Sequence, residues 1–203
     1  MPLFRSKAEA KVIEAGYDPA RLPPGQYLTE KWPVLHAGSV PTVDLTTWTL
    51  TISGEIENPL TLTWETLRDL PSGEVTVDIH CVTRWSRFDT TFKGVHWSEL
   101  AKLAGPTPSG RYVVAQAEQG FTANLPIEAI EDENALIAYE ADGEPLTRDH
   151  GGPVRLMVPS RYFWKSAKWL TGLELLDHDE PGFWERYGYH NDADFTKEQR
   201  YSF

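Results

Sequence analysis

Short runs in which β-branched and aromatic residues alternate with polar ones recur along the chain, and proline or glycine interrupts them. Such alternation places one side of a strand in a core and the other toward solvent, so it favours strands over long helices. The stretch "WTLTISGEIENPLTL" predicts strands over residues 47–54 and 60–63 with a break at "ENP". Thr63 then caps a predicted helix over residues 64–70. The pattern predicts an α+β fold in which strands dominate.

The same alternation continues toward the C-terminus. Further strands are predicted for "EVTVDIHC", "RYVVAQAE", "VRLMVP" and "KWLTGLELLD". "HWSELAKLAG" predicts a helix closed by glycine, "PIEAIED" a helical turn, and "NALIAYEADGEPL" a hairpin that turns at Asp142 and Gly143. Hydrophobic residues make up 40% of the 203 positions and aromatic residues 12%, which is enough to build the core of a single compact domain.

Both ends of the chain depart from this pattern. Proline and glycine punctuate residues 1–44, so we expect an irregular arm there, apart from a short helix over residues 6–15. The last 27 residues are polar, aromatic and irregular. The rings of "GFWERYGYHNDADF" are expected to pack over the sheet and cover apolar surface. Alternatively, they form a wall of a substrate pocket, with His190 in reach, or a docking patch.

Charge and cysteine content limit the classes of partner. The net charge of −11 argues against nucleic acid, because a phosphate backbone would be repelled. No stretch approaches the roughly 20 apolar residues that a membrane span requires. The N-terminal residues show neither the apolar core of a signal peptide nor a twin-arginine pair, so we expect a cytoplasmic protein. A single cysteine fits a reducing compartment and cannot form a disulfide framework.

That cysteine, Cys81, follows a predicted strand and begins the stretch "CVTRWS". A lone cysteine of this kind is most often a small buried hydrophobe. Two other interpretations stay open: a nucleophile served by a histidine base, or one thiolate ligand to a soft metal. His80 is poorly placed as the base, because neighbours on a strand point to opposite faces. His36 or His150 could fold back to serve.

The residues that follow Cys81 bear on the same question. Arg84 and Arg87 would lower the pKa of the thiol under either chemical interpretation, so they do not discriminate. We interpret Arg84 as pointing at an anionic or oxo-bearing substrate, the alternative being an ion pair with a nearby carboxylate. Trp85 and Trp97 are expected in the core, and Trp85 could also border a metal.

Residues 150–173 form a basic window in an acidic chain, since they contain no Asp or Glu although 30 of the 203 residues are acidic. Small side chains among cations allow a phosphate to approach the backbone, where N–H groups donate and Arg or Lys neutralises charge. The alternative is a solvated basic loop followed by a strand. The cations are Arg155, Arg161, Lys165 and Lys168, and the small residues are Ser160, Ser166 and Ala167.

Three stretches together resemble a known family: "HCVTRWS", "NALIAYEADGEPLTRDHGGPVRLMVP" and "SAKWLTGLEL". They are similar to the molybdopterin domain of the sulfite oxidase superfamily, and most like its short bacterial branch related to the catalytic subunit of the methionine sulfoxide reductase MsrP. The resemblance implies a sulfite oxidase-like fold over residues 32–176, with residues 1–31 as the N-terminal arm and residues 177–203 as a tail packed on the domain.

The resemblance also implies a cofactor, Mo-molybdopterin, and the residues that hold it. Cys81 falls where the family supplies its one protein thiolate to molybdenum, beside the two dithiolene sulfurs of the pterin, so it is the expected metal ligand and a catalytic residue. The other expected cofactor residues are His150 on the pterin, Arg155, the phosphate-binding Ser166, Ala167 and Lys168, and Leu35 and His36 on the cofactor's other side.

Departures from the family leave the substrate open. Sulfite-oxidising members carry a tyrosine in a segment resembling "GFTANLP", where Phe121 stands here. No haem or flavin motif is visible, so electrons are expected to pass through a separate carrier. We therefore expect a molybdopterin-dependent oxidoreductase that transfers an oxygen atom to or from a small substrate in a two-electron step. The alternatives are a cysteine-dependent hydrolase or transferase using Cys81, and a catalytically silent binding module.

Overall fold

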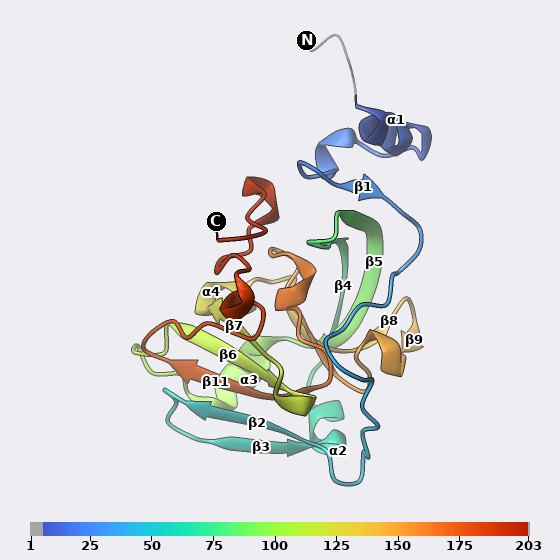
Figure 1. Ribbon diagram of the computed structural model, residues 1–203. Helices are drawn as coiled ribbons and strands as arrows, with labels where there is room; N and C mark the ends of the chain where they lie inside the picture. The colour runs from blue at the N-terminus through green and yellow to red at the C-terminus, as the bar shows by residue number, and fades with distance from the viewer. Residues whose placement is uncertain (1–5, 203) are drawn as a thin grey trace.

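The chain forms two β-sheets that share one core, and the computed structural model describes residues 6–202 (Figure 1). The larger sheet has six strands: β5 is bordered by β4 along most of its length, by β1 at its start and by β8 at its end, and β8 in turn pairs with β9 and β10. The strands are β1 (Tyr27–Leu28), β4 (Gly73–His80), β5 (Trp85–Val95), β8 (Leu136–Ala141), β9 (Glu144–Pro145) and β10 (Arg155–Met157).

The second sheet has five strands in the order β3-β2-β11-β6-β7. Its central pair, β2 and β11, is parallel, and its other pairings are antiparallel. The strands are β2 (Thr49–Gly54), β3 (Leu60–Thr63), β6 (Tyr112–Ala117), β7 (Thr122–Pro126) and β11 (Leu170–Leu176). The α-helices of the described chain are α1 (Lys7–Glu14), α2 (Trp64–Arg68), α3 (Trp97–Ala104) and α4 (Ile127–Glu131).

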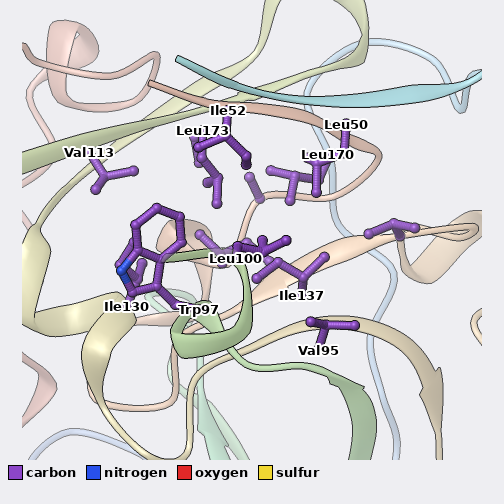
Figure 2. Close-up of a cluster of buried hydrophobic side chains, with 14 of the residues drawn as sticks. Leu50, Ile52, Val95, Trp97, Leu100, Val113, Ile130, Ile137, Leu170 and Leu173 are labelled. Carbon is purple, nitrogen blue, oxygen red and sulfur yellow. The ribbon is translucent and has the colours of Figure 1, made fainter. Parts of the chain in front are cut away.

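The main core lies where the second sheet meets helices α3 and α4 and one end of the first sheet. Leu50 and Ile52 of β2 and Leu173 of β11 point from the sheet toward Trp97 and Leu100 of α3 (Figure 2). A smaller apolar cluster lies on the first sheet and contains Cys81 and Trp85. This division sets the cysteine apart from the main core and places it at the end of β4.

Most of the expected elements are confirmed. The strands and the helix predicted over residues 47–70 are present, and the Thr63 side chain accepts a hydrogen bond from the backbone N–H of Thr66. The glycine expected to close α3 is Gly105, whose φ is +64°. The hairpin predicted at Asp142 and Gly143 joins β8 to β9. The α+β, strand-rich class is therefore correct.

The N-terminal arm is more ordered than its proline and glycine content indicated. Helix α1 begins at a reciprocal cap, in which Ser6 and Glu9 each accept a backbone hydrogen bond from the other. Strand β1 then pairs in parallel with the start of β5. Arg21 lies between helix and strand and forms ion pairs with Asp78 and Asp89 at 2.7 and 2.6 Å. The arm is thus attached to β4 and β5.

Candidate cofactor site

A cavity of about 450 Å³ opens beside the turn that joins β4 to β5. Its walls come from segments far apart in the sequence: the arm, the turn after β4, the segment between β6 and β7, the start of β10 with the loop that follows it, and the C-terminal tail. Of the predicted cofactor residues, all except His150 line this cavity: Leu35, His36, Cys81, Arg155, Ser166, Ala167 and Lys168.

Cys81 occupies the first position of the turn after β4, as its place at the end of a strand predicted. The turn is closed by backbone hydrogen bonds in both directions, from the Cys81 N–H to Trp85 and from the Arg84 N–H to Cys81, each 2.9 Å. The side chain is 7% exposed, and its sulfur lies 3.2 Å from the Thr83 hydroxyl. Burial raises the pKa of the thiol.

Both ends of the chain hold this turn in place (Figure 1). Gln26, in the arm, donates from Nε2 to the carbonyl oxygen of Cys81 at 3.0 Å. Arg200, in the tail, donates from Nη1 to the carbonyl oxygen of Val82 at 2.6 Å. Sequence reasoning missed both residues, since neither belongs to a local motif. Their contacts show that the position of the Cys81 sulfur depends on the whole chain.

The surroundings of Cys81 do not suit a nucleophile. A catalytic cysteine needs a lowered pKa and a histidine within hydrogen-bond distance, whereas burial raises the pKa of this thiol. His80 faces away, bonding Ser86 through Nδ1 at 2.9 Å. His150 bonds Thr147 and the Trp32 carbonyl, and His36 bonds the Gly38 carbonyl. No histidine in residues 6–202 hydrogen-bonds the sulfur.

Arg155 and Lys168 bring two cations to the cavity wall. Arg155 is 1% exposed and donates to the carbonyl oxygens of His150 and Ser166 at 2.8 and 2.7 Å. Lys168 donates to the carbonyl oxygen of Asp149 at 2.5 Å. Among the described residues, neither cation forms an ion pair with a carboxylate. Burial lowers the pKa of Arg155 to about 9, and burial with the nearby Arg155 charge lowers that of Lys168 to about 7.

The other two cations of the basic window serve different purposes. Lys165 is fully buried and forms an ion pair with Glu185 of the tail at 2.7 Å. Arg161 donates to the carbonyl of its neighbour Ser160 at 3.1 Å. The window therefore divides, with Arg155 and Lys168 at the cavity and Lys165 anchoring the tail.

The glycines of "HGGP" explain how Lys168 reaches its position. Gly151 has a φ of +101°, and a Cβ added there would lie 2.9 Å from the Cβ of Lys168. Only glycine allows this backbone to pass so close to the lysine side chain. Ser166 and Ala167 precede Lys168 and are buried, so the segment runs along the cavity wall with its charge at the end.

This packing predicts that Gly151→Ala lowers the free energy of unfolding more than Gly143→Ala does. Both glycines have positive φ, at +101° and +82°, so both substitutions carry the backbone strain of about 1–2 kcal/mol. Only Gly151 contacts Lys168, whereas nothing lies within 4 Å of a Cβ at Gly143. Urea denaturation should show about 1–3 kcal/mol of further loss for Gly151→Ala. Equal losses would contradict the close contact.

His150 lies behind the cavity wall rather than on it. Its ring packs against Trp32 at 4.1 Å between centroids, and its Nε2 lies 3.2 Å from the Trp32 carbonyl oxygen. Its own carbonyl accepts the hydrogen bond from Arg155. Burial lowers the pKa of its imidazole. The contacts make His150 a support for Trp32 and Arg155, both of which line the cavity.

The remaining predicted residues differ in their placement. Leu35 is 49% exposed and His36 lies 5.8 Å from the Trp169 ring, so both are at the cavity mouth. Arg84 is exposed, is not among the residues that line the cavity, and extends toward Gly25 of the arm. The backbone of Arg84 has a φ of +78°, and its side chain lies near the arm instead of in the cavity. The role assigned to Arg84 on a substrate gains no support from its position.

Aromatic side chains make up much of the remaining lining. Trp85 is 3% exposed, as expected for a core residue, and it also lines the cavity beside Cys81. Its indole nitrogen is buried and has no hydrogen-bond partner within residues 6–202. Phe183, Trp184 and Tyr189 of the tail complete the wall, so the tail does form part of a pocket. Their number in "GFWERYGYHNDADF" was the signal for that role.

These residues fit a molybdenum pterin cofactor. An unpaired buried cation is costly, so Arg155 and Lys168 call for an anion such as a phosphate. The buried Trp85 N–H has no acceptor within residues 6–202, so a ligand with an acceptor atom would satisfy it. The flat aromatic side chains of the lining suit a heterocycle. The Cys81 sulfur is a soft donor of the kind that binds molybdenum alongside other sulfurs.

Comparison with known proteins decides the family. The model of the oxidoreductase molybdopterin binding domain matches residues 37–184. The chain belongs to this family of molybdopterin-binding oxidoreductases. Family membership implies Mo-molybdopterin as the cofactor, in agreement with the chemistry of the cavity.

Individual relatives support the assignment. The chain is 45% identical to "Uncharacterized oxidoreductase YuiH" of Bacillus subtilis (strain 168), over 90% of this chain and 92% of that protein. It is 29% identical to a sulfite oxidase of Arabidopsis thaliana and 28% identical to the catalytic subunit MsrP of a protein-methionine-sulfoxide reductase from Gluconobacter oxydans (strain 621H). These alignments cover 75% and 68% of this chain, which spans only 48% and 50% of those relatives.

A solved structure shows the same fold. The sulfane dehydrogenase SoxCD from Paracoccus pantotrophus superposes with a TM-score of 0.66 at 25% identity, over 71% of this chain and 42% of that one. The sulfite oxidase-like fold expected of this molybdopterin-binding family is confirmed. Among residues 6–202, no helix combines the length and the apolar character needed to cross a membrane.

Proposed function

We propose that the chain catalyses two-electron oxygen-atom transfer to or from a small substrate, and that a separate protein carries its electrons. The proposal depends on one observation: the buried Cys81 and two cations, Arg155 and Lys168, line the same cavity. Both cations donate to backbone carbonyl oxygens, and neither pairs with a carboxylate among the described residues. A bound molybdenum centre supplies the redox chemistry, because it can gain or lose two electrons together with an oxygen atom.

The protein's own contribution is binding and orientation. The Cys81 sulfur would hold the metal, and the hydrogen bonds from Gln26 and Arg200 would keep that sulfur fixed at the end of β4. Arg155, at the start of β10, and Lys168, in the loop between β10 and β11, would neutralise the cofactor's phosphate. The aromatic walls would limit water around a bound cofactor, and Leu35 and His36 border the mouth.

Metal and pterin analysis of protein purified from molybdate-replete cells tests the proposal. We expect about one molybdenum and one pterin per chain, together with turnover of a small oxide or oxyanion when an artificial electron carrier is supplied. Protein that contains neither molybdenum nor pterin would contradict it. An iodoacetamide-sensitive hydrolase or transferase activity in such metal-free protein would favour the cysteine enzyme instead.

A further inference from the structure

The C-terminal tail brings a phenol into the cavity. Tyr189 lines the same cavity as Cys81, and it is the tyrosine among the lining residues that the structure describes. Phe121, where sulfite-oxidising relatives were expected to carry their tyrosine, also lines the cavity but has no hydroxyl. The hydroxyl missing from one wall is therefore present on another.

The tail is held firmly enough to place this side chain. Its Glu185 forms the buried ion pair with Lys165 and accepts a hydrogen bond from the Trp164 indole at 2.7 Å. The Tyr189 N–H donates to the Trp184 carbonyl, and its own carbonyl oxygen accepts from the Ser202 hydroxyl at 2.9 Å. Segments anchored by buried polar contacts keep a fixed geometry, which a substrate contact requires.

The Tyr189 ring is fixed as well. It packs edge-on to Trp164 with 5.1 Å between ring centroids, and it lies at 5.0 Å from Trp184. These two tryptophans also line the cavity. Contacts on two sides leave the ring little freedom, so the direction of its hydroxyl is set by packing.

The Tyr189 hydroxyl is free to bind a ligand. It has no hydrogen-bond partner among residues 6–202, whereas the nearby Thr83 hydroxyl contacts the Cys81 sulfur and the Ser166 hydroxyl accepts from the Val158 N–H. A phenol keeps its proton at physiological pH, so the Tyr189 hydroxyl is a neutral donor there.

We propose that Tyr189 is a catalytic residue whose hydroxyl donates a hydrogen bond to the oxygen atom carried by the substrate. This role rests on the proposed oxygen-atom transfer, which requires such an oxygen on either substrate or product. Arg155 and Lys168 are occupied by the cofactor in that scheme, and Glu118 is the carboxylate in the lining, so a neutral oxide suits the site better than an anion.

The matched pair Tyr189→Phe and Tyr187→Phe tests the role. Each variant removes one hydroxyl and keeps the ring, but Tyr187 is 71% exposed and does not line the cavity. Calorimetric titration of the molybdenum-loaded proteins with dimethyl sulfoxide measures binding without turnover. We expect Tyr189→Phe to bind the probe about 5- to 10-fold more weakly and Tyr187→Phe to match wild type, with molybdenum and pterin contents unchanged in both.

The outcomes separate this role from the function on which it rests. A fully loaded Tyr189→Phe protein that binds the probe as tightly as wild type would overturn the role of Tyr189 and leave the proposed function standing. Loaded wild type that binds no probe would also count against the role. Wild type that takes up no molybdenum would overturn the proposed function itself.

Discussion

Cys81→Ser is expected to lower turnover by about a thousandfold or more while leaving most of the pterin bound. The hydroxyl that replaces the thiol is a hard, poorly ionised donor, so it cannot supply the soft thiolate that molybdenum requires. The pterin should remain because Arg155 and Lys168, which are proposed to hold its phosphate, lie on a different segment. Steady-state assays and pterin fluorescence after denaturation measure the two effects separately.

A variant of the same turn controls for disruption of the loop. Thr83→Ser keeps a hydroxyl beside the sulfur, which lies 3.2 Å from Thr83 Oγ1, and it should retain most of the turnover. The assignment of Cys81 would fail if Cys81→Ser turned over substrate as fast as the parent protein.

Lys168→Gln is expected to weaken retention of the cofactor by about 10- to 100-fold, the effect of losing one charge-assisted hydrogen bond to a phosphate. The fraction of molybdenum that stays with the protein through gel filtration measures it. Lys197→Gln provides the control, because Lys197 is a lysine whose side chain is 70% exposed and pairs with Asp194 of the tail.

The pH dependence sharpens this prediction. Burial and Arg155 lower the pKa of Lys168 to about 7, so the amine is largely neutral above that pH unless an anion is bound beside it. An anion bound beside it raises the pKa again, which means that binding takes up a proton at alkaline pH. Retention by wild type should therefore weaken as the pH rises from 7 to 9, and retention by Lys168→Gln should change less. Parallel pH profiles would contradict a phosphate contact at Lys168.

The sequence predicted those elements whose stability is local. Neighbouring residues are enough to define the alternation of apolar and polar residues in β2 and β3. The same is true of the Thr63 cap of α2 and of Gly105, which ends α3. It missed β5, because this strand carries charges that suggest a loop. Distant partners pair with those charges: Arg87 with Asp142 at 2.6 Å, Asp89 with Arg21, and Lys93 with Glu140.

The candidate site divides in the same way. The resemblance of short motifs to the family selected Cys81, Arg155 and Lys168, which line one cavity although they come from a turn, a strand and a loop. Tyr189 could not be placed, because its position depends on the buried pair of Lys165 and Glu185. Arg84 was assigned from its closeness to Cys81 in sequence, but the turn's backbone directs it toward the arm.

X-ray absorption at the molybdenum edge of the purified protein tests the central claim most directly, since it counts the sulfur atoms bound to the metal. We expect the spectrum of the molybdenum-loaded wild type to fit one more sulfur ligand than the spectrum of loaded Cys81→Ser. Identical sulfur shells in the two proteins would show that the Cys81 sulfur does not bind molybdenum, and the account given for this cavity would be wrong.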